Sequence, residues 1–330
     1  MRRRALTGIQ PSGTPHIGNF LGAIQPALAL QDSHDCFFFI ASYHALTSQR
    51  DPVALREQIR VVAATWLALG LDPSRTVLWA QHDVPEVTEL MWVLSTITGK
   101  GLLDKGHAFK DAAARGQAEL VNVGLYVYPV LMAADILAFH ADVVPVGQDQ
   151  KQHLEMSRDI AERFNRLYGE TLRSPDPLIQ EAVATVPGLD GHKMSKSRGN
   201  GIEIWLPAKQ LRKKVMAIAT DSTPMEEPKD PDTCTVFKLY SLFARPEETA
   251  ALAAAYRGGN FGYGHAKQAL FEVMDRHFTA PRERYTDLMA HPSHIEEVLD
   301  AGALRARAVA RETLSLVRER VGLTGRLAAR

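Results

Sequence analysis

The sequence predicts an α/β protein in which a doubly wound parallel sheet is joined to a second, mostly α-helical domain. Over the first 200 residues, short apolar runs typical of buried strands alternate with helical segments. This order of elements builds a parallel sheet with helices on both faces. After about residue 205 the strand patterns stop. The length of 330 residues also favours two domains over one.

Four strands are expected. Residues 36–41 (CFFFIA) form a continuous apolar run with polar flanks, which is typical of a strand buried on both faces. Pro52 lies where the first turn of a helix tolerates proline. We therefore expect strands at 4–9, 36–41, 76–80 and 142–146, and helices at 18–30, 52–69, from 85 onward and from 149 to 168.

The longer connection at residues 100–139 is expected to contain two or three helices. Beyond the sheet, apolar residues recur at helical spacing. The expected helices of the second domain are 207–220, 233–244, 247–256, 264–277 and 294–321.

The charges of the chain balance, because it contains 38 Lys and Arg residues and 38 Asp and Glu residues. No global basic field therefore indicates nucleic-acid binding, and any RNA contact must use local patches. A solvated helix face is the alternative for such patches. The candidates are Arg212, Lys213 and Lys214 and the arginines at 305, 307, 311, 318, 320 and 326.

The two cysteines, Cys36 and Cys234, form no CxxC pair, and the sequence suggests neither a disulfide framework nor a zinc site. The basic N-terminus is followed by Gly8 and Pro11, which interrupt the apolar core that a signal peptide needs. No apolar run approaches the roughly 20 residues that span a bilayer. We expect a soluble cytoplasmic protein without membrane association.

Two polar loops contain residue types that can bind phosphates. The first follows the first strand and ends at the start of a helix, where unpaired N–H groups favour anions. It contains Gln10, Pro11, Ser12, His16, Gly18 and Asn19. The second offers two lysines and two hydroxyl groups in the run Lys193, Met194, Ser195, Lys196 and Ser197.

A third group of residues shares one face of a predicted helix. Tyr128, Met132 and Asp135 are four and three positions apart, which places their side chains side by side. Methionine is apolar and polarisable and suits a large flat ring. The carboxylate of Asp135 can accept a hydrogen bond from an indole N–H, which is only a donor.

The first loop (Pro15 to Asn19) and the second (Lys193 to Ser197) resemble the HIGH and KMSKS signatures of class I aminoacyl-tRNA synthetases. Further stretches resemble the bacterial tryptophanyl-tRNA synthetases, and the similarity runs from about residue 5 to residue 323. These stretches are residues 8–13, 132–137, 144–147, 149–153, 161–165 and 220–222. The resemblance implies a Rossmann-like fold and ligation of tryptophan to tRNA(Trp) through a tryptophanyl-adenylate, with release of AMP and pyrophosphate.

The resemblance also implies roles for individual residues. His16, Asn19, Lys193 and Lys196 are the expected catalytic residues, and Mg²⁺ is expected to arrive with the ATP phosphates without a protein ligand. ATP is expected to contact the two loops together with Gly147, Gln148, Asp149 and Val186. Tryptophan is expected to contact Asp135, Met132, Tyr128, His44, Gln150 and Val144.

The domains follow from the same resemblance. Residues 1–200 are expected to form the catalytic domain, with a helical dimerisation insertion near 85–130. Residues 201–293 resemble the anticodon-binding domain, and residues 294–330 a C-terminal helix that packs back on the catalytic domain. The expected partners are tRNA(Trp), tryptophan, ATP and a second copy of the chain.

Three positions depart from the family pattern, namely Leu6, Ser42 and Gln148. They surround the expected substrate site and bear on affinity and selectivity. Two alternatives remain open from the sequence. One is a paralogue that acts mainly as a tryptophan- or tRNA-binding regulatory partner with weak ligase activity. The other is a tyrosyl-specific enzyme, although those enzymes carry Gln at the position of Met132.

Overall fold

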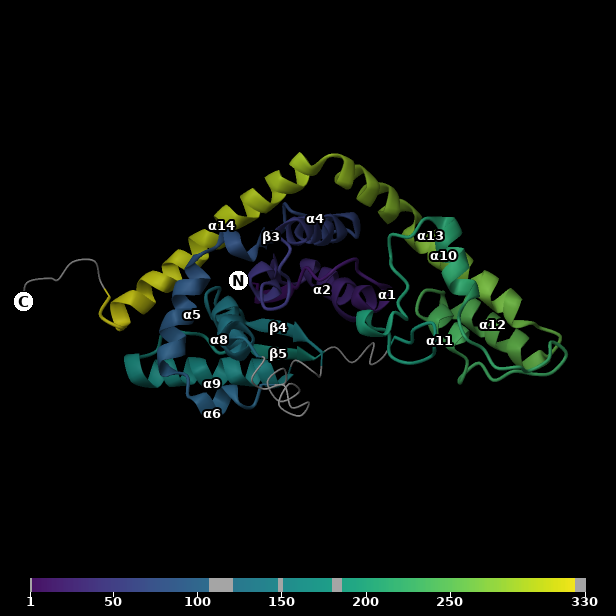
Figure 1. Ribbon diagram of the computed structural model, residues 1–330, viewed down its shortest axis with the longest axis horizontal. Coiled ribbons are helices and arrows are strands. Elements are labelled where there is room, and N and C mark those ends of the chain that lie inside the picture. Colours follow the sequence, from purple (N-terminus) through teal and green to yellow (C-terminus); the bar gives the residue numbers. More distant parts are fainter. Residues whose placement is uncertain (1, 107–120, 148–150, 180–185, 324–330) are drawn as a thin grey trace, which may run out of the picture.

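The computed structural model describes residues 2–106, 121–147, 151–179 and 186–323 (Figure 1). Its centre is a parallel sheet with strand order β3-β2-β1-β4-β5. The strands are β1 (Arg4–Ile9), β2 (Asp35–Ile40), β3 (Thr76–Ala80), β4 (Val143–Val146) and β5 (Asp176–Ile179). In this order, strands are added on one side of β1 up to β3 and on its other side from β4, and this reversal of strand order between β1 and β4 confirms the Rossmann-like doubly wound fold.

The first four strands confirm the prediction, and β5 was missed. Its sequence, Asp-Pro-Leu-Ile, is short and contains Pro177, which argues against a strand in a sequence pattern. The structure places β5 at the edge of the sheet, paired only with β4. Proline is tolerated there because an edge strand does not need every backbone donor.

The side chains of the sheet alternate between two cores. Cys36, Phe38 and Ile40 of β2 lie in one core, while Phe37 and Phe39 lie in the other. Helices α1 (Ile17–Asn19), α2 (Gln25–Ala29) and α4 (Pro52–Ala68) contribute to the first core. Helices α5 (Glu86–Ile97), α8 (Val123–Leu137) and α9 (Lys151–Tyr168) contribute to the second.

The helix predicted at 18–30 is one continuous helical run with an uneven pitch. Helix α1 passes into a π-helical turn at Phe20–Ile24 and then into α2. The short helices α3 (Ser42–Ala45) and α6 (Lys100–Leu103) follow β2 and α5. Of the two or three helices expected at 100–139, α6 and α8 fall within this range. Residues 107–120 lie outside the described residues.

The second half is helical, as predicted, and shares the first core. It comprises α10 (Ala208–Met216), α11 (Thr235–Ser241), α12 (Pro246–Gly258), α13 (Tyr263–Ala290) and α14 (Pro292–Arg320). The Phe20 ring contacts the Phe278 ring edge-on with centroids 5.2 Å apart, and Trp205 stacks on Tyr285 at 4.3 Å. Among the described residues, no helix is both long and apolar enough to cross a bilayer.

Helix α13 is much longer than the predicted 264–277, because it continues through Pro281. A proline inside a helix removes one backbone hydrogen bond, so the pattern predicted an earlier end. Packing of α13 against α4, α10 and α11 accounts for its continuation. The Arg284 Nε donates to the carbonyl oxygen of Ala68 at 2.9 Å, which attaches this second half of α13 to the end of α4.

Helix α14 crosses back over the half of the chain that contains the sheet and covers the outer edge of β3 (Figure 1). Three of its arginines contact α5. Arg307 and Arg311 both pair with Glu86, and Arg318 pairs with Glu89. These pairs attach α14 to α5, and contact of these arginines with RNA phosphates stays a prediction.

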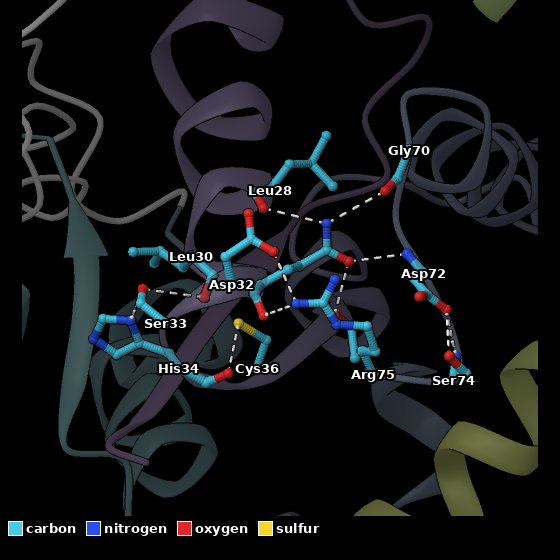
Figure 2. A network of polar contacts seen from close by, with 12 residues as sticks. Leu28, Leu30, Asp32, Ser33, His34, Cys36, Gly70, Asp72, Ser74 and Arg75 are labelled. Atoms are coloured by element: carbon cyan, nitrogen blue, oxygen red, sulfur yellow. Dashed lines mark hydrogen bonds and ion pairs between the residues drawn. The ribbon is translucent and has the colours of Figure 1, made fainter.

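Polar contacts join the segments that precede β2 and β3, at the amino ends of the strands (Figure 2). Arg75 pairs with Asp32 at 2.8 Å. The Gln31 side-chain oxygen accepts hydrogen bonds from Asp72 N and Thr76 Oγ1, both at 2.9 Å. This network ties the turn after α2 to the loop before β3 at the end of the sheet opposite to the site described below.

We expect Gly302→Ala to destabilise the protein, because α14 lies so close to β3 that a Cβ at Gly302 collides with the Leu78 carbonyl oxygen. Overpacking of this kind lowers the free energy of unfolding by about 1–3 kcal/mol. The matched control is Gly264→Ala in α13, where an added Cβ meets open space. That change should raise stability by up to about 1 kcal/mol, since Gly is the poorer helix former. Chemical denaturation followed by circular dichroism tests both, and equal stability of the two variants contradicts the expectation.

Candidate active site

A cavity of about 470 Å³ opens at the carboxyl ends of the strands, between β1 and β4. In doubly wound sheets, this reversal point is where ligands bind. The lining is apolar apart from a few polar groups, as is typical of a pocket for a small molecule. The lining residues are Leu6, Thr7, Gly8, Gln10, Gly22, Ala23, Phe39, Ala41, His44, Thr47, Leu125, Tyr128, Met132, Asp135, Ile136, Val144, Pro145, Val146 and Gly147.

The structure brings together most of the residues expected to contact tryptophan. Tyr128, Met132 and Asp135 face the cavity from α8, His44 lines it from α3, and Val144 lines it from β4. Asn122 fixes the start of α8, because its side chain accepts a hydrogen bond from Leu125 N. The sixth expected residue, Gln150, lies outside the described residues, as do Gln148 and Asp149.

Asp135 is the buried charge of the site, with 2% of its surface exposed. Gln81 Nε2 donates to both carboxylate oxygens, at 2.7 and 2.8 Å. His44 Nε2 lies 2.8 Å from Oδ2. Burial raises the pKa of Asp135, and the hydrogen bonds from His44 and Gln81 oppose that rise. These bonds leave acceptor capacity on the carboxylate, which has about four lone-pair sites.

The hydroxyl of Tyr128 contacts Nε2 of the buried His153 on α9. Burial raises the pKa of Tyr128 to about 12, so the phenol keeps its proton at neutral pH. One departure from the family pattern, Leu6, lines the cavity. Ser42 does not line it, and its Oγ lies 2.9 Å from His82 Nδ1. The departure at Ser42 therefore affects the cavity only through neighbouring residues.

The first loop, which follows β1, is fixed around His16, which is 7% exposed. His16 Nδ1 accepts a hydrogen bond from Asn19 N at 3.2 Å, and Asn19 Oδ1 accepts one from His16 N at 3.0 Å. Burial, reinforced by the charge of Lys196, lowers the pKa of His16 and keeps the ring neutral at pH 7. Because Nδ1 accepts, the proton of the neutral ring is on Nε2, which is then a hydrogen-bond donor.

The second loop lies against the first, although the two are far apart in the sequence. Lys196 Nζ donates to the carbonyl oxygens of Ser12 at 2.7 Å and Gly13 at 3.2 Å. Desolvation lowers the pKa of Lys196. Both carbonyl acceptors are uncharged, so these bonds position the ammonium group without cancelling its charge.

The two loops also pack through apolar atoms. Met194 is buried, and its backbone N donates to the carbonyl oxygen of Val186 at 2.9 Å. A Cβ at Gly18 would meet the His16 ring and Met194, so the space beside this glycine is occupied by the protein itself. Val186 is likewise part of the buried core. Contacts of Gly18 and Val186 with ATP therefore stay predictions.

The remaining expected ATP residues differ in exposure. Lys193, Gln10 and Ser12 are exposed, whereas Pro11 is buried beneath the loop. Ser195 N donates to Asn200 Oδ1 at 2.8 Å, and Ser195 Oγ accepts from Arg198 N at 3.3 Å. The side chain of Ser197 lies outside the described residues. Their roles toward ATP stay predictions.

Lys214, one of the residues considered for RNA contact, binds the protein instead. Its Nζ donates to the Gly201 carbonyl oxygen at 3.0 Å and to Glu203 at 3.1 Å. Arg212 donates to Gln268, and Lys213 is exposed. Of this basic run, Arg212 and Lys213 keep the exposure that a phosphate contact needs.

Two buried amides of the site were missed in the sequence. Gln81 supports Asp135, as described above. Asn200, 4% exposed, shapes the second loop, because its Nδ2 donates to Asp190 Oδ1 at 2.7 Å and to the Lys193 carbonyl oxygen at 3.2 Å. Their position was the available signal: Gln81 follows a strand directly, and Asn200 lies between two glycines after the KMSKS run.

The fold and the two touching loops define a class I aminoacyl-tRNA synthetase. A family model described as "tRNA synthetases class I (W and Y)" matches residues 2–279, so the chain belongs to this family. Within it, the chain is 48% identical to a tryptophan–tRNA ligase of Fusobacterium nucleatum, over 98% of this chain and 99% of that protein. It therefore falls in the tryptophanyl branch, and the resemblance drawn from the motifs is confirmed.

Solved structures agree with this assignment. The crystal structure of tryptophanyl-tRNA synthetase from Campylobacter jejuni complexed with ADP and tryptophan matches with a TM-score of 0.91 and 46% identity, over 97% of this chain and 99% of that one. The enzyme from Mycoplasma pneumoniae matches with a TM-score of 0.83 and 30% identity, over 98% and 99% of the two chains.

Proposed function

We propose that the chain joins L-tryptophan to tRNA(Trp) in two steps. In the first, the tryptophan carboxylate attacks the α-phosphorus of ATP, and pyrophosphate leaves. In the second, a hydroxyl of the terminal ribose of the tRNA attacks the carbonyl carbon of the adenylate, and AMP leaves. The observation that carries the proposal is the buried Asp135 carboxylate in a largely apolar cavity between β1 and β4, in a chain whose HIGH-like and KMSKS-like loops are in contact.

The first step needs stabilisation of the charge that develops on pyrophosphate. We assign this to Lys196 and Lys193, assisted by the Nε2–H of His16 and the amide of Asn19. The contact between Lys196 and the first loop supports this assignment, because it holds the ammonium beside the helix start that His16 caps. Donors that are already oriented stabilise charge without reorganising during the reaction.

Mg²⁺ is proposed to accompany ATP, since phosphate oxygens are the hard ligands that it prefers. Among the described residues, no group of three or more His, Cys, Asp or Glu side chains is placed to hold a metal ion. We therefore assign no protein ligand to it. Gln10 and Gly147 line the cavity and are the proposed neighbours of the adenylate.

Selection of tryptophan is assigned to Asp135 and Met132. The Asp135 carboxylate is the proposed acceptor for the indole N–H, and Met132 packs on the ring. Tyrosine is disfavoured because Met132 offers no hydrogen bond to a phenol hydroxyl. The polar pair of Tyr128 and His153 supports a place for the amino-acid ammonium group beside Tyr128.

We further propose that the chain works as a homodimer in the cytoplasm, where tRNA is charged for translation. Two exposed apolar residues support a dimer contact in the predicted segment 85–130. Trp92 on α5 is 72% exposed and Val123 at the start of α8 is 75% exposed. The free thiols of Cys36 and Cys234 suit a reducing compartment.

ATP–pyrophosphate exchange assayed with each of the twenty amino acids tests the function. We expect exchange that depends on tryptophan and exceeds that with phenylalanine by a large factor, because a site built for one buried hydrogen bond rejects an analogue without the donor by about 10⁴-fold. Tryptophan binding without exchange would instead identify the regulatory paralogue. Exchange that is fastest with tyrosine would overturn the assignment of the pocket.

A further inference from the structure

We propose that Gln81 is a positioning residue that holds the Asp135 carboxylate in the orientation needed to accept the indole N–H, and so sets the selectivity of the pocket. The inference rests on the proposed function. Gln81 directly follows β3 and is 1% exposed. It is not among the residues that line the cavity, so it acts through Asp135 rather than by touching the substrate.

The geometry of the contact fixes the plane of the carboxylate. Gln81 Nε2 lies 2.7 Å from Oδ1 and 2.8 Å from Oδ2 of Asp135, so one donor reaches both oxygens. His44 Nε2 reaches only Oδ2, at 2.8 Å. A bond to one oxygen leaves the carboxylate free to turn about its terminal bond, a broad torsion. Contact with both oxygens removes that freedom.

The orientation of the Gln81 amide is itself determined. Its oxygen accepts a hydrogen bond from the backbone N of Tyr43, at 2.9 Å. Since a backbone N–H can only donate, this end of the amide must be the oxygen, and the NH₂ group must face Asp135. The amide thus connects the start of α3 to the last turn of α8 and determines which face of Asp135 stays available to the pocket.

A neutral amide has an advantage over a charged partner at this position. His44 and Gln81 are the side chains that hydrogen-bond to Asp135, from α3 and from the end of β3. Lysine or arginine in place of Gln81 would pair with Asp135 and use its charge. The amide satisfies the buried carboxylate while leaving it an acceptor for a further donor, which in the proposed reaction is the substrate.

The test compares two substrates in exchange assays with wild-type protein and Gln81→Met. One substrate is tryptophan, and the other is its analogue with sulfur in place of the indole N–H, β-(3-benzothienyl)alanine. In the wild type we expect a strong preference for tryptophan in kcat/KM. In Gln81→Met we expect that preference to fall about tenfold or more, because the carboxylate is no longer held for the N–H. A general loss of packing would lower kcat/KM for both substrates equally and leave the ratio unchanged, which would overturn the proposal.

Two further variants keep the test decisive. Gln31→Met is the matched control, because Gln31 is also an amide that joins two segments, but at the opposite end of the sheet. It should alter stability and leave the substrate ratio unchanged. Gln81→Glu keeps the shape and the acceptor for Tyr43 but sets two carboxyl groups face to face, and should reduce the ratio as well. If Gln81→Met does not fold, the ratio measured with Gln81→Glu alone tests the proposal.

Absence of tryptophan-dependent exchange in the wild type refutes the proposed function. Tryptophan-dependent exchange in the wild type, with an unchanged substrate ratio in the folded Gln81 variants, refutes only this inference.

Discussion

Lys196→Ala should reduce the rate of tryptophan-dependent pyrophosphate exchange by about 10²–10³-fold, the loss expected when one oriented donor to a developing anion is removed. Tryptophan affinity should stay near that of the wild type, because Lys196 does not line the tryptophan cavity. Exchange kinetics and calorimetric titration with tryptophan measure the two quantities separately.

The matched control for this variant is Lys209→Ala, which removes an exposed lysine of α10 a short distance along the chain. It should leave both exchange and tryptophan affinity unchanged. Exchange at the wild-type rate in Lys196→Ala would show that the catalytic assignment is wrong. A parallel loss of tryptophan affinity would indicate that the variant had disturbed the fold of the pocket.

The contacts of Lys196 explain how a charge is kept ready without being neutralised. Its bonds to the carbonyl oxygens of Ser12 and Gly13 are of the kind that an incoming phosphate oxygen can replace. A carboxylate partner would form a stronger, charge-assisted bond. It would also oppose the approach of a phosphate. Neutral acceptors thus hold the lysine in position, and their replacement by a phosphate oxygen costs little free energy.

The sequence predicted the strands and the pocket helix because their signals are local. The run Cys36–Ala41 and the spacing of Tyr128, Met132 and Asp135 each follow from a periodicity within one element. Strand β5 and the second half of α13 were missed because a proline contradicts the local pattern, and pairing with β4 or packing against α4 overrides it. Such tertiary contacts leave no trace within a short window of sequence.

The residues that support the site were not predicted from the sequence, for a similar reason. A lone glutamine after a strand is ordinary in a sequence, and only the fold brings Gln81 against Asp135, 54 positions away. The same holds for the arginines of α14, because their sequence gives no sign of the pairing with Glu86 and Glu89 that the fold produces. Residues that face a ligand belong to motifs, whereas residues that orient them are recognised from geometry.

Asp135→Asn should lower kcat/KM for tryptophan by about 10–100-fold, the cost of losing a hydrogen bond to a charged acceptor. The change keeps the shape of the side chain but replaces one acceptor oxygen with an NH₂ donor. At either oxygen position the new NH₂ group meets the Gln81 donor, which contacts both, so at least one hydrogen bond of the wild type is lost. The preference for tryptophan over phenylalanine should therefore fall by a similar factor, which exchange assays with both amino acids measure.

Asp142→Asn is the matched control for this change. The Asp142 carboxylate accepts a hydrogen bond from Arg4 N at 2.7 Å and pairs with Arg173. Both contacts lie at the amino ends of the strands, away from the cavity. Its loss should lower stability without altering the preference for tryptophan. An unchanged preference in Asp135→Asn would mean that the indole N–H is recognised elsewhere, and the assignment of both Asp135 and Gln81 would then fail together. A reduced preference in Asp135→Asn with an unchanged one in Gln81→Met would leave the acceptor role of Asp135 intact and would place its orientation under the control of His44.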